Sequence, residues 1–205
     1  GIIKADSQRK HKEMIETQLP FTRTINLDNG RIAEASSVSY RRLSDMRGWF
    51  ADAQAEAARL PENPLIYEVH YGYDTPSIDG QLGFGTTILY PGKIGDEYYM
   101  TKGHYHRKAD RAEIYYGLSG DGELLLQTRD GATTVQHIAP GVVAYIPAYH
   151  AHRTINTGTE NFVFLSIYPA DAGNDYESVA ELGFASLIVE REGVPEIIPS
   201  TRYRA

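Results

Sequence analysis

Residues 103–120 of this chain read GHYHRKADRAEIYYGLSG, and the spacing of their histidines and glutamate is the most informative pattern in the sequence. Successive side chains of a β-strand point to opposite faces, so His104 and His106 are expected to share one face. Glu113 falls in the next expected strand, which would place it across a hairpin from the two imidazoles. A histidine pair alone is a solvated surface feature about as often as a metal site. The added glutamate favours a metal site.

A second segment, PGVVAYIPAYHAHRTIN (residues 140–156), supplies the third imidazole. Pro-Gly marks a turn, VVAYIP is typical of a buried strand, and Pro147 indicates a corner. His150 and His152 share strand parity, so one is expected to point inward with the other close by. Three histidines and one glutamate leave open coordination positions on a divalent ion such as Fe, Mn, Ni or Zn. The other histidines, His11, His70 and His137, have no such neighbours and are interpreted as surface or core residues.

Composition narrows the classes of partner. The 205 residues carry a formal net charge of -7, which argues against nucleic acid and anionic membranes as partners. There are no cysteines, so any metal must be held by imidazole, carboxylate or water. The start of the chain lacks the apolar segment of a signal peptide, and no stretch approaches membrane-spanning length. A soluble cytoplasmic protein is therefore expected.

From residue 65 onward the chain consists of short segments rich in β-branched and aromatic residues, such as LIYEVHYGY (65–73) and LGFGTTILY (82–90). Glycine, proline, aspartate and asparagine separate them at short intervals. Many strands at this spacing predict an antiparallel sandwich or barrel rather than alternating βαβ units.

The remaining segments predict only flanking elements. We expect a short helix near residues 10–17, a weak strand at 21–26, and an alanine-rich helix within 41–60. Ser44 or Asp45 would cap that helix, and Pro61 and Pro64 would stop it. A helix at 176–182 and strands at 185–190 and 196–199 would close the fold. The predicted organisation is an N-terminal extension (1–40) followed by one β-domain (41–205).

The two histidine segments resemble the paired motifs of the cupin family. The first family motif is G-x5-H-x-H-x3,4-E-x6-G, whereas six residues separate His106 from Glu113 here. The second is G-x5-P-x-G-x2-H-x3-N, and Tyr149 replaces its middle glycine. The resemblance implies an all-β jelly-roll barrel with a few short helices. It also implies that the metal ligands are His104, His106, Glu113 and His152.

A narrower resemblance involves TTILYPGKIGDEYYMTKGHYH (86–106) and YPADAGNDY (168–176), and extends over about residues 41–190. These segments are similar to those of cupin-type phosphoglucose isomerases. The resemblance implies a homodimeric enzyme that interconverts glucose 6-phosphate and fructose 6-phosphate, a small-molecule sugar phosphate. It also implies a divalent metal, with Fe(II) as first choice and Mn, Ni or Zn as alternatives.

Family roles transfer to this chain where the residue matches. The resemblance assigns catalysis to Glu113 and Tyr115, and substrate or phosphate contacts to Tyr67, Thr87, Thr101, Gly103, Tyr168 and Tyr176. Asn174 is kept as a further contact, although it departs from the family. The family has histidine where this chain has Asn174; an amide donates a hydrogen bond but carries no charge, so altered phosphate binding is expected. In a regular strand Thr101 and Gly103 would face away from His104, unless a bulge at Gly103 turns the chain.

Two questions stay open at this point. Glu113 could shuttle a proton between C1 and C2, or a hydride could shift directly between the carbons. Other functions on the same scaffold are a mannose-6-phosphate isomerase, an oxalate-processing manganese enzyme or a dioxygenase. A non-catalytic sugar-binding or storage cupin would need the fold but not Glu113.

Overall fold

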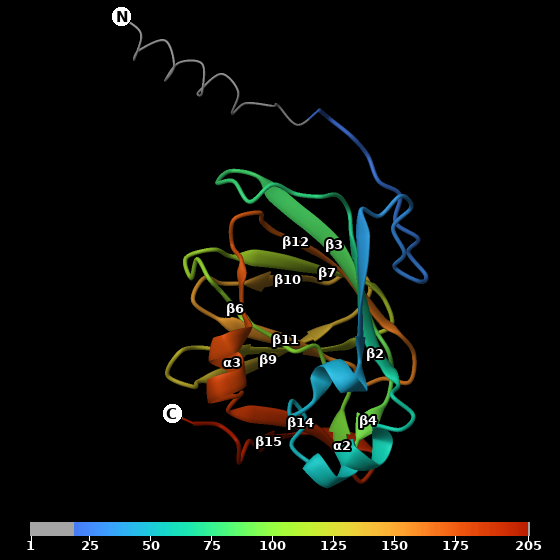
Figure 1. Cartoon of the computed structure of the whole chain (residues 1–205), viewed down its shortest axis with the longest axis vertical. Helices are drawn as coiled ribbons and strands as arrows, with labels where there is room; N and C mark the ends of the chain where they lie inside the picture. Colours follow the sequence, from blue (N-terminus) through green and yellow to red (C-terminus); the bar gives the residue numbers. More distant parts are fainter. Residues whose placement is uncertain (1–18, 205) are drawn as a thin grey trace, which may run out of the picture.

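The computed structural model describes residues 19–204 (Figure 1). The helix expected near residues 10–17 lies outside the described residues, as does His11. Among the helices of the described part, none is long and apolar enough to cross a membrane.

Strands dominate the molecule, and its helices are short. The strands are β1 (Ser37–Arg42), β2 (Leu65–Tyr71), β3 (Leu82–Leu89), β4 (Lys93–Ile94), β5 (Glu97–Tyr98), β6 (Tyr105–His106), β7 (Glu113–Ser119), β8 (Gly122–Gln127), β9 (Thr133–Ile138), β10 (Val143–Ile146), β11 (Ala151–Ile155), β12 (Phe162–Pro169), β13 (Asn174–Asp175), β14 (Ser186–Arg191) and β15 (Val194–Pro199). The helices are η1 (Leu43–Met46), α2 (Ala53–Arg59) and α3 (Tyr176–Leu182). Strand β1 begins at Ser37, so the sheet starts before residue 41, where the β-domain was predicted to begin. The division of the chain at residue 40 stays a prediction.

Two antiparallel sheets form the barrel (Figure 1). The larger has the order β1-β2-β3-β12-β7-β10, and the smaller has the order β11-β8-β9. Isolated bridges from His104 to His152 and from Met100 to Ile155 add the segment before β6 to the smaller sheet, beside β11. The chain alternates between the sheets at β7–β8, β9–β10, β10–β11 and β11–β12, which is jelly-roll connectivity. The prediction of an all-β cupin barrel with a few short helices is confirmed.

The core lies between the two sheets and follows from strand alternation. On β7 the buried and exposed residues alternate, so that Glu113 and Tyr115 are buried whereas Ile114 and Tyr116 are exposed. Leu124, Phe162 and Ile146 are fully buried. Each such side chain contributes roughly 1.5–3 kcal/mol of apolar burial. The strands that carry the histidines and the glutamate are therefore fixed by packing.

The alanine-rich helix expected within residues 41–60 is present as α2, but the predicted start at Ser44 or Asp45 is wrong. Residues 41 and 42 complete β1, a turn of 3-10 helix follows at η1, and α2 begins only at Ala53. The capping residue is Asp52, whose side chain accepts hydrogen bonds from the backbone N–H groups of Gln54 and Ala55, and neither Ser44 nor Asp45 has this role. Burial of Leu43, Met46 and Phe50 overrides the helix propensity of this stretch. The predicted end was right, since α2 stops at Arg59, before Pro61.

The strand expected at 21–26 is also wrong, because only one bridge forms there, between Ile25 and Ile32. The Asn26 side chain accepts hydrogen bonds from the backbone N–H groups of Asp28 and Asn29, which turns the chain back. The Thr86 hydroxyl then donates to the carbonyl of Gly30 and anchors this segment on the outer face of the larger sheet.

The C-terminal elements follow the predictions closely. The helix expected at 176–182 is α3, and its cap is Asp175, whose side chain accepts from the Ser178 N–H group. Strands β14 and β15 begin one and two residues away from the predicted starts. Figure 1 shows α3, β14 and β15 on the same side of the barrel as the smaller sheet.

Candidate metal centre and cavity

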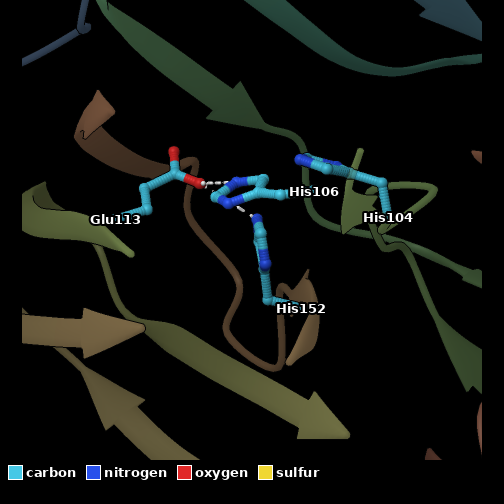
Figure 2. A group of neighbouring side chains, drawn as sticks. All are labelled: His104, His106, Glu113 and His152. Carbon is cyan, nitrogen blue, oxygen red and sulfur yellow. Dashed lines mark hydrogen bonds and ion pairs between the residues drawn. The ribbon is translucent and has the colours of Figure 1, made fainter. Parts of the chain in front are cut away.

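Three separate parts of the barrel bring the predicted ligands together. His104 and His106 come from the β6 region, Glu113 begins β7, and His152 lies on β11. The backbone bridge between His104 and His152 holds two of the ligands side by side. Their ligand atoms and those of His106 and Glu113 all lie within 4.8 Å of one another. Figure 2 shows the four side chains converging on one region.

The carboxylate is central to this group. Glu113 Oε2 lies 3.1 Å from His106 Nε2 and 3.1 Å from His152 Nε2. The imidazole rings of His104 and His152 are 4.4 Å apart between centroids. Three imidazole nitrogens and one carboxylate oxygen form a donor set suited to a divalent first-row metal.

The hydrogen bonding of His106 tests whether a metal fits. His106 Nδ1 lies 2.8 Å from the carbonyl oxygen of Arg111. A carbonyl can only accept, so Nδ1 carries a proton and Nε2 of the neutral ring presents a lone pair. This lone pair faces the Glu113 carboxylate, which is itself an acceptor. Two facing acceptors require a cation between them, either a proton or a metal ion.

His152 gives a second observation of the same kind. Its side chain is 1% exposed, and its Nε2 forms no hydrogen bond, although Glu113 Oε2 lies 3.1 Å away. Burying a polar nitrogen without a partner is costly, and coordination of a metal ion would remove the cost. The residues present therefore fit a metal ion.

Ionisation in this group also suits metal binding. Burial raises the pKa of the Glu113 carboxyl, but the adjacent His106 and His152 imidazoles outweigh it and lower the pKa to about 2. Burial and then the His152 imidazole lower the pKa of His104 well below its usual value. Burial also lowers the pKa of His106, but the hydrogen bond to Glu113 more than offsets this and raises it. The carboxylate is charged and His104 is neutral, as ligation requires.

A cavity of about 140 Å³ lies at the four-residue group. All twelve residues predicted for the site line it: Tyr67, Thr87, Thr101, Gly103, His104, His106, Glu113, Tyr115, His152, Tyr168, Asn174 and Tyr176. Four further residues were not predicted: Val69, Tyr71, Phe164 and Ser166. Each lies two or four positions from a predicted residue on the same strand, so the strand period of two was the signal that could have found them.

Gly103 resolves the parity question for Thr101. Its φ of +72° interrupts the strand, so Thr101, Gly103 and His104 all reach the same cavity. A side-chain Cβ at Gly103 would lie 2.8 Å from the His152 carbonyl oxygen and 2.9 Å from Phe184. Both the backbone conformation and the close approach therefore require glycine.

Replacing Gly103 by alanine is expected to destabilise the protein more than the same change at Gly193. Both glycines have positive φ, which costs roughly 1–2 kcal/mol for alanine, but nothing lies within 4 Å of a Cβ at Gly193. The crowded Gly103 site adds about 1–3 kcal/mol of overpacking. Urea unfolding of both variants measures the difference. Equal losses would show that the backbone conformation alone selects glycine at position 103.

His152, on β11, and His150, just before this strand, have different environments. His152 is buried in the group, whereas His150 is half-buried and its Nδ1 donates to the carbonyl of Ala148. Tyr149, which replaces the motif glycine, has a φ of +67° and so keeps the backbone conformation that glycine favours. At the end of the motif, the Asn156 amide donates to the carbonyls of Leu89 and Glu160 and fixes the turn after β11.

An anchor that the sequence did not reveal supports His106. The unusually long loop between His106 and Glu113 contains Arg111, whose guanidinium donates two hydrogen bonds to Asp171, at 3.1 and 2.8 Å. Lys108 Nζ donates to the same carboxylate at 2.6 Å. These bonds hold the backbone whose carbonyl orients the His106 ring. The six-residue spacing was the only signal of this anchor.

The strand β13 connects Asn174, an exposed residue of the cavity wall, to the metal group. Asn174 pairs through its backbone with His106, and Asp175 pairs with Tyr105. The Asn174 amide donates to the Tyr176 hydroxyl at 3.2 Å.

The jelly-roll fold and the buried group of three histidines and one glutamate define a cupin with a metal-competent centre. Residues 40–198 match the family described as "Glucose-6-phosphate isomerase (GPI)". The chain belongs to this glucose-6-phosphate isomerase family.

Named relatives agree with the family match. The chain is 50% identical over 189 residues to a glucose-6-phosphate isomerase of Thermococcus gammatolerans. The aligned stretch covers 92% of this chain and 99% of the relative. It is 46% identical to that of Pyrococcus furiosus, over 90% of this chain and 97% of the relative. It is 40% identical to that of Sinorhizobium medicae, over 80% of this chain and 77% of the relative. Among solved structures, an oxalate decarboxylase of Bacillus subtilis is 23% identical with a TM-score of 0.40, over 53% of this chain and 27% of that one.

Proposed function

We propose that this chain is a metal-dependent isomerase that interconverts glucose 6-phosphate and fructose 6-phosphate. The observation that carries the proposal is the cavity itself, because its hydroxyl-lined wall ends on the buried His/Glu group. The same residues that the family resemblance assigns to metal and substrate line this one cavity. The identity to glucose-6-phosphate isomerases over most of the chain supports the same reaction.

The proposed ligands are His104, His106, Glu113 and His152. Fe(II) is the first choice, and Mn, Ni or Zn would suit the same donors. When bound, such a cation supplies a Lewis acid that polarises a carbonyl oxygen. The nitrogen-rich donor set favours these metals over Mg and Ca, which prefer oxygen ligands.

Glu113 is the proposed proton carrier, with Tyr115 beside it. Aldose–ketose conversion requires one hydrogen to leave C2 and one to reach C1, while a hydroxyl proton passes from O2 to O1. The Glu113 carboxylate can take the C2 hydrogen as a proton and return it to C1. Burial and then the charge of Glu113 raise the pKa of Tyr115 well above its usual value. Tyr115 therefore stays protonated and donates a hydrogen bond to a substrate oxygen.

The rest of the cavity is proposed to hold the sugar and its phosphate. Burial raises the pKa values of Tyr67 and Tyr168, so both phenols remain neutral hydrogen-bond donors. Thr87, Thr101 and the Gly103 backbone offer further donors of the kind that phosphate oxygens accept. Tyr176 and Asn174 lie at the same cavity, and Asn174 brings a donor without a charge.

Parallel assays with glucose 6-phosphate and mannose 6-phosphate test the proposal. We expect turnover of glucose 6-phosphate to fructose 6-phosphate, lost on chelation and regained with a divalent metal. Preference for mannose 6-phosphate would assign the chain to a different sugar-phosphate isomerase. Metal and sugar phosphate binding without turnover would leave a sugar-binding cupin.

The same assay in D2O separates the two routes for the hydrogen. Incorporation of solvent deuterium at the transferred position is expected if Glu113 carries a proton. Complete retention of the substrate hydrogen would favour a hydride shift between the carbons.

We further propose that the chain acts as a cytoplasmic homodimer. The outer face of the larger sheet carries a patch of exposed apolar residues, Ile114, Tyr116, Val143, Tyr145 and Ile167. They are neighbours across β10, β7 and β12, since Tyr145 pairs with Ile114 and Ile114 pairs with Ile167. A continuous apolar patch next to the edge strand β10 is typical of an interface, and a second copy of the chain is its proposed occupant.

Replacing Tyr145 by aspartate is expected to convert the dimer to a monomer, because a charge would be buried in the interface. Light scattering gives the mass in solution. Tyr40, which is 54% exposed on β1, provides a matched control to Tyr145, which is 59% exposed. A monomeric unmodified chain, or a dimer that tolerates the Tyr145 change, would contradict the proposed interface.

A further inference from the structure

A second and larger cavity has Arg153, the residue after His152, in its wall. Its volume is about 490 Å³, against about 140 Å³ for the first cavity. The segment after η1, helix α3, strand β14 and the C-terminal residues enclose it. None of the twelve predicted site residues lines it. We call it the arginine cavity, because Arg47, Arg153, Arg202 and Arg204 all contribute to its wall.

The charges of this wall are unbalanced. The four arginines face a single acidic lining residue, Glu181, in a chain whose formal net charge is -7. Within residues 19–204, none of these arginines forms an ion pair. Arg202 donates to the carbonyls of Phe50 and Gly48, which are uncharged partners. The side chains of Arg47 and Arg204 make no hydrogen bond to the described part of the chain.

Among the four arginines, Arg153 gives the strongest support for an anion site, because its side chain is buried and only 4% exposed. Its guanidinium stacks on Phe184, 4.3 Å from the ring centroid, and lies 5.7 Å from that of Trp49. A buried cation with no bonded carboxylate is costly, and an anion in the cavity would offset the cost.

We propose that the arginine cavity is a second ligand site, which binds a small anion bearing phosphate or carboxylate groups. Guanidinium groups present paired N–H donors that match both kinds of oxyanion. The aromatic and apolar wall, with Trp49, Phe184 and Leu187, would contact the carbon skeleton of such an anion.

The two cavities share a wall, so an anion bound in the arginine cavity can affect the first cavity without entering it. Arg153 donates two hydrogen bonds to the Lys102 carbonyl, at 3.2 and 2.8 Å. Lys102 stands between Thr101 and Gly103, which line the first cavity. Phe184 lines the arginine cavity and would lie 2.9 Å from a Cβ at Gly103. An anion that binds Arg153 is therefore expected to weaken its hydrogen bonds to the Lys102 carbonyl and to shift the segment 101–104. The resulting change in turnover rests on the proposed function.

Trp49 makes the site directly observable, because it is the only tryptophan of the chain and lies in this wall. The experiment titrates the full-length protein with inorganic phosphate, succinate and 3-phosphoglycerate at constant ionic strength, and records tryptophan fluorescence. We expect a saturable change with at least one of them. Binding of phosphate or of succinate shows whether the cavity recognises a phosphate or a carboxylate group. 3-Phosphoglycerate tests a ligand that carries both groups.

Two double variants give the matched comparison. Arg47→Gln with Arg204→Gln removes two cavity charges that hold no other part of the chain. Arg31→Gln with Arg191→Gln removes the same net charge at positions that do not line the cavity, where Arg191 pairs only with the exposed Asp96. The first pair is expected to weaken anion binding by about tenfold or more, and the second to leave it unchanged.

The outcomes that would overturn the proposal are specific. They are the absence of a saturable change with all three anions, or equal binding by the two double variants. Purely competitive inhibition by the anion, equal in both double variants, would place its binding in the first cavity and also overturn the proposal. The fluorescence measurement requires no turnover. Anion binding by a protein without isomerase activity would therefore contradict the proposed function alone.

Discussion

Replacing Glu113 by glutamine lowers kcat for glucose 6-phosphate by roughly 10²–10⁴-fold, the contribution expected of a positioned proton carrier. The amide has nearly the same shape as the carboxylate but cannot accept and return the proton. Its oxygen can still coordinate a metal ion, so part of the metal content should remain. Loss of turnover with metal still bound would separate the role of proton carrier from that of ligand.

Glu123 is the matched control for this experiment. It lies on β8 and pairs with His137 at the surface, with Glu123 Oε1 2.9 Å from His137 Nδ1. The change of Glu123 to glutamine is expected to leave kcat within about twofold, as for surface positions generally. Metal analysis of each preparation accompanies the kinetics. A Glu113→Gln enzyme that binds metal and retains nearly full kcat would assign the proton to another group.

Removal of the bound divalent metal is expected to abolish activity and to lower stability at the same time. Loss of several kcal/mol of transition-state stabilisation corresponds to a decrease of about 10³-fold or more in rate. A metal present at about 1,000 times its dissociation constant stabilises the folded state by about 4 kcal/mol. The apo protein would then retain Nε2 of His152 as a buried nitrogen without a partner. Calorimetry with and without a chelator measures the stability difference.

A His152→Gln variant should reproduce both effects without a chelator. His137→Gln is its control, because the His137 side chain is 54% exposed and lies outside the cavity. Adding metal back should restore the unmodified protein and not the His152 variant. Full activity in protein shown to contain no metal would rule out the metal-dependent reaction.

The sequence was most informative where function constrains it. His104, His106, Glu113 and His152 could be predicted from their spacing and from the resemblance to cupin motifs, and the structure brings them together. The substrate contacts needed the family resemblance, because buried tyrosines and strand threonines are ordinary sheet residues. Val69 and Ser166 were missed although they follow the same strand period as predicted neighbours.

Local propensity failed where distant contacts decide the conformation. The alanine-rich part of 41–60 is helical as expected, but the helix starts only at Ala53, because Leu43, Met46 and Phe50 are placed by the core. The anchor formed by Arg111 and Asp171 joins residues 60 positions apart in the chain, a separation that no local pattern encodes. The arginine cavity likewise draws its residues from distant segments, and neither composition nor spacing pointed to it.

The pairing of Asn174 with His106 has a consequence for the evolution of this enzyme family. The contact between β13 and β6 is made by backbone atoms, so it does not depend on which side chain occupies position 174. Mutation can therefore exchange the polar group of residue 174 in the cavity wall while His106, a proposed metal ligand, keeps its place. The backbone pairing therefore lets the side chain at position 174 be substituted without moving His106.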